Sequence, residues 1–275
     1  MESGKRIEVG SLNWFYREAE PTNDSARTPV ILLHGLVSQG YSWRNVLPVL
    51  AEQGFRAIAP DWIGCGYSSM PDRRDFAYTP DAFISALEAL IAQFGFEKVS
   101  IVAQGFLGSV GIQYALRHPE QVERLAIFNC PIEGAKLPWK LQQMSIPLVG
   151  DMMTQDPLLV DRTLEGAGGY RIEDSDLDVY RRPWLKTSDV GRSLLAILQN
   201  LQLKQATAEI EAGLATWKNP LLIGWGMRDP WLSIAPARSL KAELAELDEV
   251  GHYPQEDWHE KVCEALIPFL KRQAV

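Results

Sequence analysis

Continuous apolar runs recur along the chain and alternate with segments of helical spacing. Four such runs are PVILLHG at 29–35, FRAIAP at 55–60, KVSIVAQ at 98–104 and VERLAIF at 122–128. An unbroken run of this length is typical of a strand that is buried on both faces of a parallel sheet. The segments with helical spacing that separate them are 41–53, 80–94 and 106–118. This alternation predicts a doubly wound α/β fold with a mostly parallel sheet.

The two ends of the chain add to this pattern, and a long insertion interrupts it. RIEVG and LNWFYREAE, on either side of Gly10 and Ser11, predict two strands joined in a hairpin. After residue 132 the pattern becomes mostly helical, with proline and glycine interruptions, until NPLLIGWG resumes the strands. A helix at 233–243, a strand at 244–249 and a helix at 258–271 are then expected. We therefore predict a core of residues 1–132 and 215–275 with a helical cap, residues 133–214, inserted into it.

Charge and cysteine content argue against several classes of protein. The net charge is -8 and no cluster of Lys and Arg stands out, so nucleic acid is not an expected partner. The three cysteines are far apart and lack metal-ligand spacing, which predicts a reducing compartment, no metal and no cofactor. No segment has the length and apolarity of a membrane span, and the first residues have no apolar run like that of a signal peptide. A cytoplasmic location is the expectation.

The order of several motifs resembles the α/β-hydrolase superfamily over nearly the whole chain. These motifs are HG at 34–35, PDWIGCGYS at 60–68, the strand–turn–helix at 101–118, GWGMRDPW at 224–231 and GHYPQEDW at 251–258. Within the superfamily the chain looks most like the haloalkane dehalogenase and epoxide hydrolase branch. The residues behind this are DWIGCGYSSMP at 61–71, Gln104 before the turn and YRRPW at 180–184. The resemblance implies an eight-stranded, mostly parallel sheet flanked by helices, with the cap inserted after the sixth strand.

The same resemblance assigns roles to particular residues. A nucleophile would stand at the strand-to-helix turn, and the N–H groups of Leu36 and Phe106 would stabilise an oxyanion. His252 would act as the base and Asp229 would hold its tautomer. Each of these two has an alternative role, since Asp229 could cap a turn before Pro230 and His252 could be a buried structural histidine.

The nucleophile position falls on Gly105, which has no side chain. The turn reads Ala103-Gln104-Gly105-Phe106-Leu107, where the family pattern is small-x-nucleophile-x-small, so Leu107 is a second departure. A shifted register that uses Gly105 and Gly108 as the small pair puts no Ser, Cys or Asp at the tip. Ser109 would then lie about one turn into the helix and point away. The sequence therefore predicts an inert nucleophile position.

Two functions remain open, and whether the protein is an enzyme is not decided. The first is a pseudo-hydrolase that binds a small apolar molecule or a protein partner, with cap residues such as Trp139, Met144 and Tyr180 near the ligand. The second is an enzyme without a nucleophile, in which a dyad of His252 and Asp229 deprotonates a substrate or water. Because two departures fall on the turn itself, we favour binding.

Overall fold

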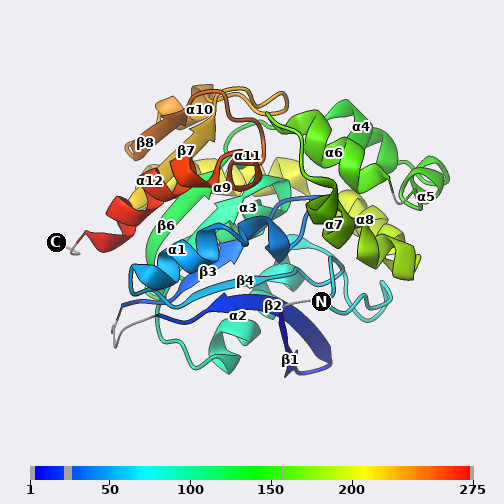
Figure 1. The fold of residues 1–275 in the computed structure, drawn as a ribbon, viewed down its shortest axis with the longest axis horizontal. Helices are drawn as coiled ribbons and strands as arrows, with labels where there is room; N and C mark the ends of the chain where they lie inside the picture. Colours follow the sequence, from blue (N-terminus) through cyan, green and yellow to red (C-terminus); the bar gives the residue numbers. More distant parts are fainter. Residues whose placement is uncertain (1–3, 22–26, 157, 273–275) are drawn as a thin grey trace.

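The sheet of the computed structural model, which describes residues 4–21, 27–156 and 158–272, has eight strands. Their order across the sheet is β1-β2-β4-β3-β5-β6-β7-β8 (Figure 1). β1 pairs with β2, and β2 with β4, in antiparallel fashion, and the remaining neighbours are parallel. The predicted α/β-hydrolase fold with a mostly parallel sheet is confirmed. The strands are β1 (Lys5–Val9), β2 (Leu12–Ala19), β3 (Val30–Leu33), β4 (Ala57–Pro60), β5 (Val99–Gln104), β6 (Val122–Phe128), β7 (Leu221–Gly226) and β8 (Glu243–Leu247).

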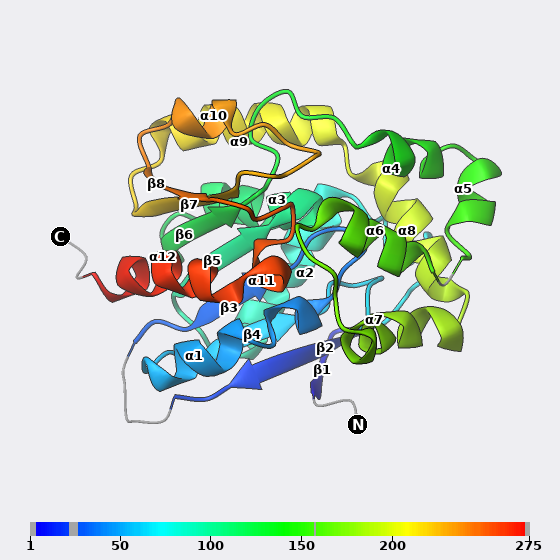
Figure 2. The same ribbon diagram turned by 45° about the horizontal axis from the view of Figure 1, so that its top comes forward.

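Helices cover both faces of this sheet, and its central strands β3, β4 and β5 are buried at every position. In β3, Ile31 and Leu33 belong to the core on one face, whereas Val30 and Leu32 belong to the core on the other. α2 (Pro80–Gln93) and α3 (Gly105–Arg117) pack on the first face. α1 (Val46–Glu52) and α12 (His259–Lys271) pack on the second (Figure 2).

Between β6 and β7 the chain forms a group of helices. These are α4 (Trp139–Met144), α5 (Val149–Met153), α6 (Leu159–Ala167), α7 (Asp174–Lys186), α8 (Asp189–Asn200) and α9 (Leu203–Thr216). Figures 1 and 2 show α4 to α8 gathered beyond one end of the sheet. α9 returns beside α3, where Glu209 accepts hydrogen bonds from Gln113 and Arg117. The division into a core and a cap of residues 133–214 stays a prediction.

A cluster of polar side chains joins α7 to the sheet layer. Arg44 lies 2.6 Å from Asp176 of α7 and 2.7 Å from Glu256. Glu256 belongs to the short helix α11 (Pro254–Asp257) and also accepts a 2.7 Å hydrogen bond from Tyr180 of α7. Because Glu256 is almost fully buried, these bonds are little screened by solvent. They hold the middle of α7 against the loops that follow β3 and β8.

Two helices differ from the sequence prediction, each for a local reason. The expected helix at 41–53 divides into a 3-10 turn, η1 (Gly40–Trp43), and α1, which starts at Val46. This start places Pro48 in the first turn of α1, where its missing N–H costs no helical hydrogen bond. The expected helix at 233–243 is only α10 (Ala235–Arg238). Pairing of Glu243 with Leu222 starts β8 one residue earlier than predicted, and residues 239–242 before it form turns and bends.

A buried ion pair organises the loops after β3 and β4. Asp61 is fully buried, and its carboxylate lies 3.2 Å from the guanidinium of Arg17. The same carboxylate accepts backbone hydrogen bonds from Gly40 at 2.7 Å and from Tyr67 at 2.8 Å. The carboxylate of Asp61 therefore joins β2, the loop after β3 and the loop after β4.

Replacing Asp61 with alanine is expected to lower the free energy of unfolding by about 3–5 kcal/mol, because it leaves Arg17 buried without its partner. Urea denaturation of both proteins measures this difference. Glu246→Ala, which removes the partner of the exposed Arg238, is the control and should cost less than about 1 kcal/mol. Equal losses for the two variants would contradict the structural role of Asp61.

Candidate functional site

Gly105 occupies the sharp turn between β5 and α3. Its φ is +70°, in the left-handed region that favours glycine. A Cβ atom built on Gly105 would lie 3.0 Å from Cα of Gly35 and 3.3 Å from Nε2 of His252. A side chain at this position would therefore point directly at the histidine ring.

His252 and Asp229, which the sequence analysis paired, lie together at the ends of neighbouring strands. Asp229 follows β7 and His252 follows β8, and their Nδ1 and Oδ2 atoms are 2.8 Å apart. Both side chains are 1% exposed. Asp229 also caps the turn that follows it, because its Oδ1 accepts hydrogen bonds from the N–H groups of Trp231 and Leu232. The catalytic role of the pair stays a prediction.

Asn129, which the sequence analysis missed, completes the surroundings of Asp229. It follows β6, donates a 2.8 Å hydrogen bond to Oδ2 of Asp229 and accepts one from the N–H of Gly226. Burial raises the pKa of Asp229, but the His252 ring, Asn129 and the Trp231 N–H together bring it below its usual value. Nδ1 of His252 is thus the ring nitrogen bonded to Asp229, and Nε2 is the one that faces Gly105. The signal in the sequence was only an Asn directly after a buried strand.

Gln104 ties the turn to the other two loops of the site. Its Oε1 accepts a 3.1 Å hydrogen bond from the N–H of Gly35, and its Nε2 donates a 2.7 Å bond to the carbonyl of His252. Leu36 and Phe106 therefore lie on two loops that are held together beside Gly105. That their N–H groups stabilise an oxyanion stays a prediction.

Aromatic rings enclose the ring of His252. Its centroid lies 4.6 Å from Trp231, 5.0 Å from Tyr253 and 5.7 Å from Phe106. The hydroxyl of Tyr253 donates to the carbonyl of Leu36 at 3.0 Å, which fixes this ring. Around His252 the site is therefore apolar and shielded from water.

Ser109 and Leu107, two residues near the turn that the sequence analysis singled out, lie away from its tip. Ser109 is buried and donates a 2.6 Å hydrogen bond to the carbonyl of Phe106, so it faces its own helix. Leu107 is buried in the core rather than at the tip of the turn. The close approach to β5 falls instead on Gly108, where an added Cβ would lie 3.3 Å from the carbonyl carbon of Ala103.

His34, the other histidine beside Gly105, has a structural role. Its Nε2 accepts a 3.1 Å hydrogen bond from the N–H of Trp62, and burial lowers its pKa to about 4. A histidine that stays neutral and already has a partner shapes the loop after β3, as expected for the HG motif.

Two hollows lie near the site, on the side of α4 to α8. The first has a volume of about 20 Å³, room for about one water, beneath α7 and α8. Its lining is mainly apolar, with Val37, Val160 and Leu194, but includes the buried hydroxyl of Ser38. The second, a groove of about 690 Å³, runs between α4, α6 and Trp231. The described residues contain no cluster of three or more His, Cys, Asp or Glu side chains able to hold a metal ion.

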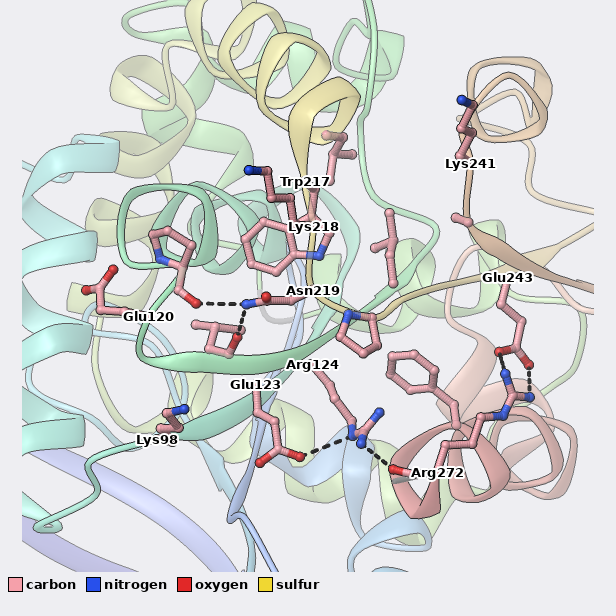
Figure 3. A pocket seen from close by; sticks show the side chains of 17 residues that line it. Lys98, Glu120, Glu123, Arg124, Trp217, Lys218, Asn219, Lys241, Glu243 and Arg272 are labelled. Atoms are coloured by element: carbon pink, nitrogen blue, oxygen red, sulfur yellow. Dashed lines mark hydrogen bonds and ion pairs between the residues drawn. The ribbon is translucent and has the colours of Figure 1, made fainter. Parts of the chain in front are cut away.

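A larger cleft of about 920 Å³ lies away from the site (Figure 3). Val122, Leu221 and Glu243, the first residues of β6, β7 and β8, line it. Parallel strands present their ligand sites at their carboxyl ends, whereas this cleft lies at the amino ends. Arg272 at its edge is already paired with Glu243 at 2.6 Å. The cleft is therefore separate from Gly105 and His252.

Comparisons with known proteins agree with this architecture. Residues 28–257 match a family described as alpha/beta hydrolase fold. The chain is 30% identical to a cis-3-alkyl-4-alkyloxetan-2-one decarboxylase from Shewanella oneidensis, covering 90% of this chain and 83% of the relative. It is 28% identical to a haloalkane dehalogenase from Mesorhizobium japonicum, over 88% of this chain and 84% of that protein.

A solved structure has a similar fold. The crystal structure of haloalkane dehalogenase DbeA from Bradyrhizobium elkani matches with a TM-score of 0.86 at 26% identity, covering 98% of this chain and 97% of the other. The haloalkane dehalogenase-like branch is thereby supported, and the likeness to epoxide hydrolases stays a prediction. In the parts of the chain that the structure describes, no helix has the length and apolarity needed to cross a membrane.

Replacing Gly105 with alanine is expected to destabilise the protein more than Gly95→Ala does. Both glycines have a left-handed φ, +70° and +73°, which costs a residue with a Cβ about 1–2 kcal/mol. At Gly95 the added Cβ meets nothing within 4 Å, whereas at Gly105 it meets Gly35 and His252. Overpacking should add about 1–3 kcal/mol at Gly105, measurable by urea denaturation. Equal costs would show that the turn is not tightly closed.

The buried carboxyl group of Asp257, close to His252 in the chain, should make the stability of the protein depend on pH. Its Oδ2 accepts hydrogen bonds from the N–H groups of Gly169 and Gly251, both at 2.7 Å. Burial raises its pKa to about 6, above the value of about 4 for an unfolded chain. Between these values the folded state binds a proton that the unfolded state has lost, so stability from this group falls as pH rises.

Relative to Asp257→Asn, the wild type should therefore lose about 2 kcal/mol of unfolding free energy between pH 4 and 6. Denaturation curves of both proteins across this range measure the difference, and other carboxylates cancel in the comparison. A difference that is constant with pH would mean that Asp257 titrates normally.

Proposed function

Because the chain belongs to the alpha/beta hydrolase fold family, we propose that it is a member in which Gly105 replaces the nucleophile. In this proposal the protein binds a small apolar molecule at the carboxyl ends of the strands and forms no covalent intermediate with it. A protein partner is the alternative occupant. Two relatives are named as a decarboxylase and a haloalkane dehalogenase. A chain that binds its ligand without reacting with it would differ from both in activity.

The observation that carries the proposal is the place that a side chain at position 105 would occupy. A Cβ on Gly105 would lie 3.3 Å from Nε2 of His252, where the family resemblance places an attacking side chain. Glycine supplies no such group, and Ser109 is turned into its own helix. Loss of a nucleophile typically costs many powers of ten in rate and leaves binding largely intact.

The surroundings support an apolar ligand. Phe106, Trp231 and Tyr253 surround His252, and the hollow under α7 and α8 is mainly apolar. Apolar walls with few polar groups are typical of small-molecule sites. The hydroxyl of Ser38, buried without a hydrogen-bond partner among the described residues, offers one polar anchor. Because this hollow holds only about 20 Å³, the ligand must displace α7 or α8 to enter.

A second function, general-base catalysis without a nucleophile, is favoured by the assembled dyad. Asp229 is held by three hydrogen-bond donors and lies 2.8 Å from His252. A substrate with an acidic proton, or a water molecule, placed where the side chain of residue 105 is missing would contact Nε2. His252 could then remove the proton while Asp229 stabilises the imidazolium.

Intact-protein mass spectrometry after incubation with a haloalkane, a β-lactone or a p-nitrophenyl ester should show no covalent adduct, and no burst of product should appear. Gly105→Asp and Gly105→Ser should stay nearly inactive, because the new Cβ lies 3.0 Å from Cα of Gly35, which must shift by a few tenths of an ångström. An adduct in the wild type would refute the proposal.

His252→Ala separates the two functions. If the protein only binds, the variant should keep its affinity for an apolar ligand found by thermal shift and lose about 1–3 kcal/mol of stability through the orphaned Asp229. If the dyad is a base, turnover should fall by about 10²–10⁴-fold while affinity is kept. Asp229→Asn, which preserves the shape of the side chain, is the matched variant.

A further inference from the structure

A groove on the outer side of Trp231 has a different chemistry from the site around His252. We name it the cationic groove and define it by Lys136, Trp139, Lys140, Leu141, Arg162 and Trp231 among its lining residues. It brings together the loop after β6, helix α4, helix α6 and the loop after β7. Neither Gly105 nor His252 lines it, although Trp231 forms a wall of the groove and packs on His252 at 4.6 Å between ring centroids.

The charge of the cationic groove is opposite to that of the whole chain. Three cations line it and no carboxylate does, whereas the chain as a whole carries a net charge of -8. Arg162 is paired with Asp156, which lies outside the groove. Within the described ranges Lys136 and Lys140 form no ion pair, and both are exposed. Their charge is therefore available to an anion.

The groove also presents an apolar surface that no part of the described chain covers. Trp139 is 71% exposed, and the half-buried Trp231 continues the apolar wall towards the site, with the buried Leu141 behind it. A large exposed apolar side chain beside free cations marks a binding surface for a molecule with both characters. The volume of about 690 Å³ lies within the range of small-molecule sites.

Two glycines leave the groove open. A Cβ atom added at Gly134 or at Gly166 meets nothing within 4 Å. Gly166 lies in α6 with no left-handed φ, so a side chain there is tolerated by the backbone and would occupy the open space. Gly134 has a φ of +53° and does not offer the same test.

We propose that the cationic groove binds an amphipathic anion, a long-chain carboxylate. The alkyl chain lies against Trp139 and Trp231, and the carboxylate is held by Lys136 and Lys140. This ligand site goes beyond the proposed function, because it needs neither Gly105 nor the dyad. A ligand in the groove would contact Trp231, whose ring also packs on His252.

Calorimetry with three probes below their micelle concentrations tests the proposal. Dodecanoate is expected to bind at least 10-fold more tightly than dodecyltrimethylammonium, which has the same chain and the opposite charge, and than butyrate, which has the same charge and a short chain. Lys136→Glu/Lys140→Glu should weaken dodecanoate binding at least 10-fold. The control, Lys218→Glu/Lys241→Glu in the distant cleft, makes the same change in net charge and should alter it less than 2-fold.

Gly166→Phe should abolish dodecanoate binding by filling the groove, whereas Gly166→Ala should keep it. His252→Ala should also keep it, which separates this proposal from the proposed function. Equal affinity for the ammonium probe, or equal weakening by both lysine pairs, would overturn the proposal. A folded Gly166→Phe protein that binds dodecanoate normally would overturn it as well, and if that variant does not fold, the lysine pairs decide.

Discussion

The parallel register of β3, β5, β7 and β8 is the constraint on which the site depends. Strands that run in one direction end at the same edge of a sheet, so the residues that follow them meet there although they are far apart in the chain. Gly35 follows β3, Gly105 follows β5, and Asp229 and His252 follow β7 and β8. The buried apolar residues that hold this register on both faces of the sheet therefore also determine the geometry of the site.

At that edge of the sheet, two buried amide side chains, Gln104 and Asn129, link the loops that carry the site. Gln104 joins the loop after β3 to the loop after β8, and Asn129 joins Asp229 to the end of β7. A buried amide must satisfy its donors and acceptor, so each of these residues has one favourable arrangement. This explains how His252 and Asp229 stay in contact: their hydrogen-bond partners do not include a side chain at position 105.

The helices α4 to α8 present different surfaces to the sheet and to solvent. Towards the sheet, α7 is held by Arg44 and Glu256 and leaves room for about one water. Towards solvent, α4 and α6 leave the open cationic groove. Trp231 lines the groove and also packs on the ring of His252. The two proposals are separate, but they share this wall.

The sequence by itself determined the fold class, the motif order and the identity of Gly105, Asp229 and His252, because apolar periodicity and turn residues act over short stretches of chain. Only the tertiary structure decided which distant groups meet. Gln104 and the carbonyl of His252 are 148 residues apart, and no local pattern distinguishes this glutamine from a solvated one. The same holds for Asn129 and for the cationic groove, whose walls come from separate segments. Contacts of this kind depend on strand register and side-chain packing, which involve the whole chain at once.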